Sequence, residues 1–195
     1  MIKCAIIGGS KIMPHSRDSI ALLQRWGEWC AKHHIVLLTG ACSGYPYVVG
    51  KACVAKGGKV IGYSPARDLD EHVEEYENPV DGCSVIRYLD NPINDKDQRL
   101  MLRSFPLVED ADVIVSVGGN WGTLFELTAS VIGGKHVLVL TDTRGISGGF
   151  EMLYDYMESN CAYAYGEQVE FISATQEVRD RLLEICKEKE EEEAN

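Results

Sequence analysis

The sequence predicts an α/β protein: a single domain built on a doubly wound parallel sheet with helices on both faces. Short β-branched apolar runs without helical period alternate along the chain with longer amphipathic segments. Glycine-rich turns follow three of these runs. No linker or repeat interrupts the pattern over 1–187, so we expect one domain there. The acidic stretch 188–195 is predicted to be a frayed, solvated end.

The first half of the chain has the order βαβαβ, which is one half of a doubly wound sheet. Strands are expected at 4–7, 35–38 and 60–63, where apolar and β-branched residues cluster. A helix is expected near 18–33, where apolar side chains recur at helical spacing. A second helix is expected at 46–56, because Pro46 suits a first helical turn.

The second half continues the alternation. The strands that we expect there are 84–89, 112–117, 137–141 and 170–173. The expected helices are 95–105, a segment that begins near 122, 149–158, and 175 to about 188. Pro106 should end or kink the first of these helices. The acidic stretch 64–79 is expected to be a solvated connection with a short helix.

The chain carries a formal net charge of −11. An acidic surface repels phosphate backbones, so DNA and RNA are not expected as the main partners. A nucleotide in a local pocket remains compatible with this charge, because backbone N–H groups and one arginine decide the local sign.

The cysteines and histidines show no ligand pattern. Seven cysteines are scattered without CxxC spacing, and five histidines form no HExxH or related motif, so no metal site is expected. The N-terminus enters a strand pattern directly, without a signal peptide, and no apolar run is long enough to cross a membrane. We therefore expect a cytoplasmic protein with reduced cysteines and no membrane partner.

Glycine-rich turns at three strand ends predict a phosphate pocket. The carboxyl ends of parallel strands meet at one edge of the sheet, and a helix N-terminus after such a turn attracts anions. The candidate phosphate-binding residues are Gly8, Gly9 and Ser10 after the first strand, Gly40, Ser43 and Gly44 after the second, and Gly118, Gly119, Asn120, Gly122 and Thr123 after the fifth.

These turns match neither of two common nucleotide motifs. A dinucleotide fingerprint needs GxGxxG after the first strand, where this chain has only Gly8-Gly9. A Walker A loop is also missing, because Gly58-Lys59 precedes a strand rather than a helix. An NAD enzyme and a P-loop NTPase are therefore not expected.

Two charged residues lie beside the third turn. Glu126 is in the first turn of the helix that follows it, and Arg103 is in the helix that precedes the fifth strand. Arg99 competes with Arg103 as the site arginine, because it lies one helical turn earlier on the same face. In the simplest alternative, Glu126 is only a first-turn acid and Arg103 only a surface cation.

The run from Arg103 to Glu126 resembles the LOG (lonely guy) family. The hallmark of that family is Arg-Lys on a helix, then Pro-Gly-Gly-x-Gly-Thr-x-x-Glu after a strand. Here Arg103, Gly119, Gly122, Thr123 and Glu126 fall on motif positions. The segments 6–10, 38–44 and 57–62 are similar to the wider LOG-like (SLOG) superfamily. Three positions depart from the hallmark: Ser104 replaces Lys, Gly118 replaces Pro and Asn120 replaces Gly.

The resemblance implies a LOG-like, nucleotide-binding Rossmann domain over 1–187. In LOG enzymes the activity is phosphoribohydrolysis, in which a nucleoside 5′-monophosphate such as AMP is split into base and ribose 5-phosphate. By motif match, Arg103 and Glu126 would be the catalytic pair, and the turn from Gly119 to Thr123 the phosphate cradle.

Other members of the superfamily leave a second function open. They include a molybdenum cofactor carrier, so a non-catalytic carrier of a nucleotide or a cofactor of that type is the alternative. Proteins labelled lysine decarboxylase-like also belong there, but no lysine here has the context of a cofactor lysine. No bound cofactor of the protein's own is therefore predicted.

A homodimer or larger homo-oligomer is expected by analogy with the family. Two aromatic-rich faces support the expectation, one with Trp26 and Trp29 and the other with Tyr154 and Tyr156. The alternative is that these side chains are simply part of the core.

Overall fold

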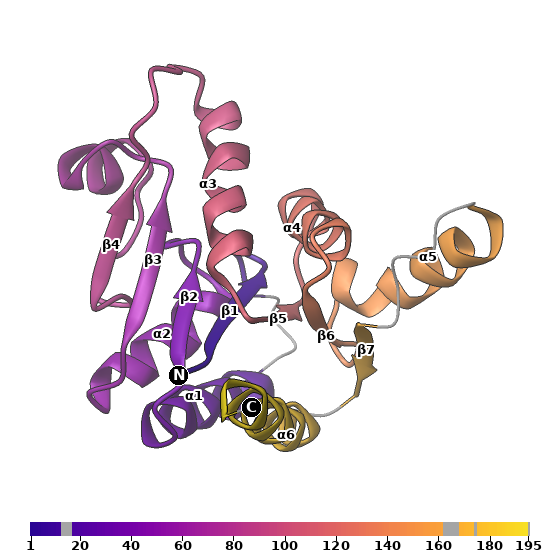
Figure 1. Cartoon of the computed structure of the whole chain (residues 1–195). Helices are drawn as coiled ribbons and strands as arrows, with labels where there is room; N and C mark the ends of the chain where they lie inside the picture. The colour runs from indigo at the N-terminus through magenta and orange to yellow at the C-terminus, as the bar shows by residue number, and fades with distance from the viewer. Residues whose placement is uncertain (13–16, 162–167, 174, 195) are drawn as a thin grey trace.

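The computed structural model describes residues 1–12, 17–161, 168–173 and 175–194. Within them, seven parallel strands form one sheet in the order β4-β3-β2-β1-β5-β6-β7 (Figure 1). The predicted α/β fold with a doubly wound parallel sheet is confirmed. The strands are β1 Lys3–Gly8, β2 Val36–Thr39, β3 Val60–Ser64, β4 Val85–Tyr88, β5 Val113–Val117, β6 His136–Leu140 and β7 Val169–Ile172.

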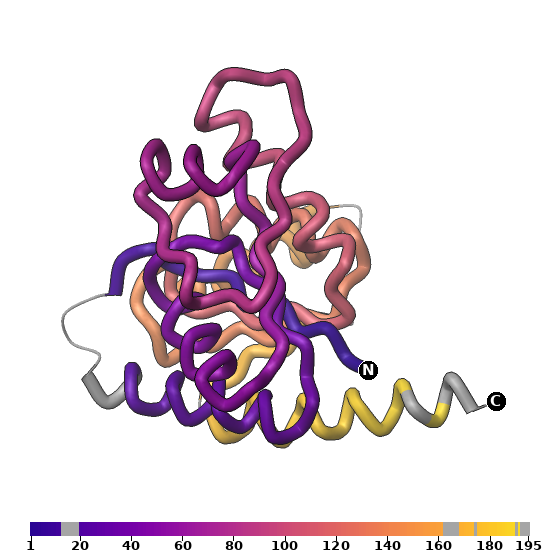
Figure 2. The backbone as a smooth tube through the Cα atoms, turned by 90° about the vertical axis from the view of Figure 1, so that its left-hand side faces the viewer, coloured from indigo at the N-terminus to yellow at the C-terminus, as the bar shows by residue number. Residues whose placement is uncertain are grey.

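Helices cover both faces of the sheet. On one face lie α1 Arg17–Lys32, α2 Tyr45–Ala55 and α6 Thr175–Ala194, and on the other lie α3 Lys96–Asp110, α4 Trp121–Ile132 and α5 Ile146–Asn160. A short π-helical segment, η1 Glu71–Glu75, follows β3. In Figure 2, α1 and α6 run along the same side of the molecule, at the bottom of the view.

The alternation of side chains along the strands builds two cores. In β1, Cys4 and Ile6 pack towards α1, α2 and α6, while Ala5 and Ile7 pack towards α3, α4 and α5. All five residues of β5 are buried, as expected for an apolar strand that is covered on both faces.

The chain reverses direction across the sheet beside β1. It proceeds outward through β2, β3 and β4, and returns to place β5 on the other side of β1. In doubly wound sheets, ligands bind at the carboxyl ends of the strands near such a switch point. The register pairs Gly8 with Val117, so the turns after β1 and β5 lie next to each other.

Three helices are longer than the sequence predicts. Helix α5 extends over Ile146–Asn160 rather than over the expected 149–158. Pro106 does not end α3, which continues to Asp110, and the following turn buries Leu107 and Val108. Burial of these apolar side chains offsets the hydrogen bond that the proline cannot donate. Helix α6 continues to Ala194 rather than ending near Glu188. No helix in the described parts of the chain is both long and apolar enough to cross a membrane.

Glu170 connects the edge of the sheet to α6. Its carboxylate accepts a hydrogen bond from Arg181 Nε at 2.8 Å and contacts the ring of His136 on β6. Burial opposes ionisation of Glu170, but the hydrogen bonds from Arg181 and His136 outweigh it, and the pKa of Glu170 is lowered.

We predict that Glu170→Gln lowers the free energy of unfolding at pH 7 by about 1 kcal/mol, a modest loss because the group is partly exposed. A carboxylate with a lowered folded-state pKa contributes stability above its ordinary pKa of 4.5, and loses it as the pH falls through the folded value. Urea titrations of wild type and variant should therefore begin to converge as the pH falls below about 4.5. A difference that stays constant from pH 7 to pH 3 would contradict this assignment.

Candidate functional site

A cavity of about 510 Å³ lies at the carboxyl ends of the strands near the switch point. Its volume is within the range of small-molecule sites. Nine of the residues singled out from the sequence line it: Gly8, Ser10, Gly40, Ser43, Arg103, Asn120, Gly122, Thr123 and Glu126. The remaining lining residues are Cys42, Pro65, Tyr76, Glu77, Asn78, Leu100, Met101, Ser104 and Phe125.

Four of the predicted glycines lie behind the lining and shape the turns. Gly44 and Gly119 have φ angles of 89° and 90°, a backbone conformation that favours glycine. A Cβ on Gly44 would collide with the carbonyl of Gly9, and one on Gly119 with the side chain of Thr123. Gly118 also has a positive φ, and its carbonyl accepts a hydrogen bond from the N–H of Ser147 at 3.1 Å.

Helix α4 begins one residue earlier than expected, at Trp121, with Asn120 as its N-cap. The Asn120 side chain accepts a hydrogen bond from the N–H of Gly122 at 3.3 Å. Thr123 is almost fully buried at the cavity wall. The first turn of a helix presents N–H groups and partial positive charge, so this end of the cavity is suited to an anion.

Arg103 and Glu126 form a buried ion pair at the cavity. Arg103 Nη1 donates to Glu126 Oε1 at 2.8 Å, and the exposed fractions of the two side chains are 12% and 6%. Ser104 Oγ donates to the same carboxylate oxygen at 3.0 Å. The other oxygen, Glu126 Oε2, accepts no hydrogen bond from a described residue. One oxygen is therefore anchored twice while the second remains available to a ligand or a water molecule.

Gly40 provides the space for the guanidinium group of Arg103. A Cβ on Gly40 would lie 2.5 Å from Arg103 Cζ and 2.6 Å from Nη2. The buried Nε of Arg103 has no hydrogen-bond partner among the described residues. The guanidinium is thus held between the β2 turn and Glu126, with its buried Nε unused.

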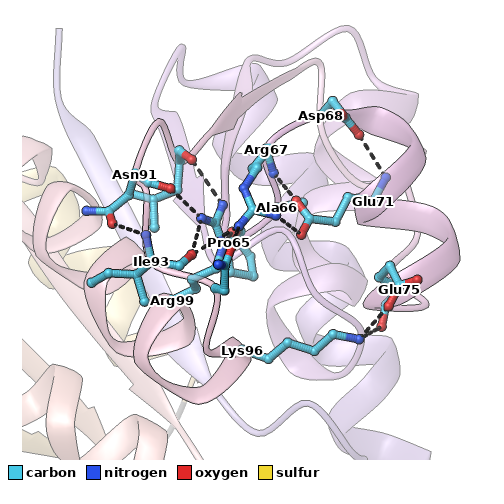
Figure 3. Close-up of polar contacts among 12 residues, drawn as sticks. Pro65, Ala66, Arg67, Asp68, Glu71, Glu75, Asn91, Ile93, Lys96 and Arg99 are labelled. Carbon is cyan, nitrogen blue, oxygen red and sulfur yellow. Dashed lines mark hydrogen bonds and ion pairs between the residues drawn. The ribbon is translucent and has the colours of Figure 1, made fainter.

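Arg99 has a different environment. It is fully buried, and its guanidinium group donates to four backbone carbonyls: Nε to Pro65 at 2.7 Å, Nη1 to Asn91 and Ile93 at 2.8 and 3.0 Å, and Nη2 to Leu89 at 3.1 Å. Figure 3 shows Arg99 between the segment after β3 and the segment before α3. Of the two candidate site arginines, Arg103 lines the cavity, whereas Arg99 connects two loops.

Three neighbouring lining residues come from a segment expected only to be solvated. Tyr76, Glu77 and Asn78 follow η1 and reach the cavity wall. No motif marks them, because it is the fold of the β3–β4 connection that brings them to the switch point. Cys42, another residue not singled out, has a raised pKa because burial outweighs the opposing effect of Arg103, so its thiol is neutral.

The described residues include no group of three or more His, Cys, Asp and Glu side chains placed to hold a metal ion. The described charged residues that line the cavity are Arg103, Glu126 and Glu77.

The chain belongs to the SLOG cluster4 family, because the model of that family matches residues 1–189. This confirms the resemblance that was drawn from the glycine turns and from the run between Arg103 and Glu126. Sequence comparison with curated proteins found no match.

Solved structures share the fold over nearly the whole chain. The structural genomics target TM1055 has a TM-score of 0.73 at 22% identity, with 94% of this chain and 99% of that chain covered. The molybdenum cofactor binding protein from Rippkaea orientalis has a TM-score of 0.71 at 20% identity, with 95% and 97% covered. DNA processing protein A from Helicobacter pylori has a TM-score of 0.64 at 19% identity, with 94% and 80% covered. At these identities the likeness establishes the fold.

We predict that Gly40→Ala destabilises the wild-type protein by about 1–3 kcal/mol, because the added methyl group displaces the guanidinium of Arg103. In an Arg103→Ala background the same change should cost less than about 0.5 kcal/mol, since the collision is gone. The free energies of unfolding of the four proteins measure this coupling. If Gly40→Ala lowered the free energy of unfolding equally in both backgrounds, Gly40 would not be needed to accommodate the Arg103 guanidinium.

Proposed function

We propose that this protein binds a nucleoside 5′-monophosphate such as AMP and hydrolyses its N-glycosidic bond to give the free base and ribose 5-phosphate. The observation that carries the proposal is the buried Arg103–Glu126 pair beside the glycine turn at the start of α4. A buried ion pair is costly to desolvate, and in a cavity such pairs are candidates for function rather than stability. Membership of the SLOG superfamily supports the assignment.

The two ends of the cavity differ in electrostatic character. The N-terminus of α4, with Thr123 and the turns at Gly8 and Ser43, would bind the phosphate through backbone N–H groups and hydroxyl donors. Because α4 begins at Trp121, Glu126 lies in its second turn rather than in the first turn expected from the sequence, and its carboxylate would face the sugar next to the phosphate. This arrangement supports a nucleotide bound through its phosphate.

Glu126 would stabilise the transition state of the hydrolysis. Cleavage of an N-glycosidic bond passes through a state with positive charge on the sugar, which a fixed carboxylate stabilises. The oxygen of a water molecule bonds to C1′ while the bond from C1′ to the base nitrogen breaks, and a proton from that water ends on the base. Oε2 is available to orient the water, because Arg103 and Ser104 hold Oε1.

A carrier without catalytic activity is the second candidate. It is favoured by the likeness to a protein described as a molybdenum cofactor binding protein. The phosphate end of the cavity suits either type of ligand, whereas only the hydrolase needs Glu126 to act on a sugar. Single-stranded DNA is named for the DNA processing protein A structure, but the net charge of −11 disfavours that partner here.

Glu126→Gln distinguishes the enzyme from the carrier. The change keeps the size of the side chain and removes its charge, so base release from AMP should fall by at least ~100-fold while nucleotide binding is kept or strengthened. Base release is measured by chromatography and binding by calorimetry. Glu151→Gln on the exposed surface of α5 is the matched control and should behave as wild type.

The carrier gives a different pattern. Wild type would bind a ligand tightly without releasing a base from any common nucleoside monophosphate, and Glu126→Gln would change affinity alone. That result would overturn the hydrolase proposal.

We also propose that the protein is a homodimer or larger homo-oligomer. The aromatic face of α1 does not support this, because Trp26 is buried and Trp29 packs against the core. Helix α5 does, since Met152 and Tyr156 are 78% and 64% exposed on it. Tyr154 instead packs against Phe150 and Phe171.

Light scattering tests the assembly. Wild type should have at least twice the monomer mass of 21.6 kDa, and a Met152→Glu, Tyr156→Glu double variant should shift towards the monomer because charges replace the contact surface. A monomer for wild type at micromolar concentration would refute the proposal.

A further inference from the structure

We propose that Tyr76 and Asn78 recognise the base of the bound nucleotide, and that the segment 76–78 determines which base is accepted. This inference rests on the proposed function. It concerns the base, whereas the Arg103–Glu126 pair is proposed to act at the sugar. It starts from the length of the cavity. The lining runs from the start of α4, above β5, to Pro65 after β3. Three strand spacings separate β5 from β3, a span of roughly 14 Å.

The wall at the far end offers unused hydrogen-bonding groups. Tyr76 lines the cavity, and its buried Oη has no hydrogen-bond partner among the described residues. The side chain of Asn78 makes no hydrogen bond to a described residue. A buried hydroxyl without a partner is costly, and a ligand that supplies one removes the cost. An asparagine amide offers both a donor and an acceptor, as the edge of a nucleic-acid base requires.

The cavity lining also contains apolar side chains. Leu100 and Met101 on α3 and Phe125 on α4 line the cavity with Tyr76. Apolar side chains together with a few polar groups suit a flat heterocycle, which stacks on its faces and bonds along its edge.

Charge sets the direction in which the nucleotide lies. Glu77 lines the cavity at this end and has no ion-pair partner among the described residues, whereas Glu71 and Glu75 in η1 are paired with Arg67 and Lys96. The Glu77 carboxylate repels a phosphate, whereas the N-terminus of α4 at the other end attracts one. The base is therefore directed to the segment 76–78.

The segment is held in place before any ligand binds. His72 is fully buried, with Nδ1 2.8 Å from Ser64 Oγ, and its carbonyl accepts from the N–H of Asn78 at 3.1 Å. Glu77 takes a φ of 51°, which turns the chain. Lys96 Nζ donates to Glu75 Oε2 at 2.7 Å, as Figure 3 shows.

Arginines secure the surrounding loops. Arg67 donates to Glu71 Oε1 at 3.0 Å and to the Asn94 side chain at 2.7 Å, and Arg99 donates to the carbonyl of Pro65 (Figure 3). Recognition groups that are ordered in advance lose less entropy on binding.

The test compares a ligand that has a base with one that lacks it. AMP and ribose 5-phosphate are titrated by calorimetry into full-length protein carrying Glu126→Gln, so that AMP is not consumed. Adding Tyr76→Phe or Asn78→Ala should weaken AMP binding roughly 5- to 10-fold, the loss for one hydrogen bond, and leave ribose 5-phosphate within ~2-fold. Asn78→Asp, which can only accept when ionised, should change the order of affinities for AMP and GMP. Tyr47→Phe on α2, which removes a hydroxyl bonded to Asp81 away from the cavity lining, is the control and should change neither ligand.

The outcomes separate the two proposals. Equal weakening of both ligands by the variants, or unchanged AMP affinity, would overturn base recognition by this segment and leave the phosphate site standing. If the protein carrying Glu126→Gln alone bound AMP no better than ribose 5-phosphate, base recognition would likewise be overturned and the phosphate site would stand. Failure to bind either ligand would overturn the proposed function, and base recognition with it.

Discussion

The pairing of β1 with β5 is the constraint on which the cavity depends. It joins two halves of the chain and places Gly8 directly beside Val117. A Cβ on Gly8 would collide with the carbonyl of Val117, so only glycine lets the two strand ends approach this closely. Both turns then open at the same edge of the sheet, where the start of α4 contributes its N–H groups. Without this register the glycine turns would not converge.

The Arg103–Glu126 pair is buried in the wall of the cavity at this edge of the sheet. It joins α3 to α4 and is buried at the point where the β2 turn has only a glycine at position 40. Burying two charges costs free energy that the hydrogen bonds of the pair must offset, and Ser104 adds one of those bonds. The result is a carboxylate with one fixed and one available oxygen. A group held in this way needs little reorganisation when charge develops next to it, which is the property that the proposed hydrolysis requires.

The β3–β4 connection shows how an acidic, polar segment can be ordered. Its composition is typical of a solvated loop, yet Arg67 binds the carboxylate of Glu71 within it and Arg99 binds the carbonyl of Pro65 at its start. These bonds replace the apolar core that the segment lacks. Tyr76 and Asn78 of this connection line the cavity, so the proposed phosphate end and the proposed base end are built by different physical means.

The sequence by itself determined the fold class, the glycine turns and two candidate arginines for a charged pair with Glu126. Strand periodicity and glycine spacing are local properties, and the match of Arg103 and Glu126 to a motif depends only on their separation along the chain. Other features required the tertiary structure. The choice of Arg103 over Arg99 depends on which loops close around each guanidinium, and the helix that continues through Pro106 depends on burial of Leu107. The arrival of the segment 76–78 at the cavity likewise depends on contacts between residues far apart in sequence, which no local pattern encodes.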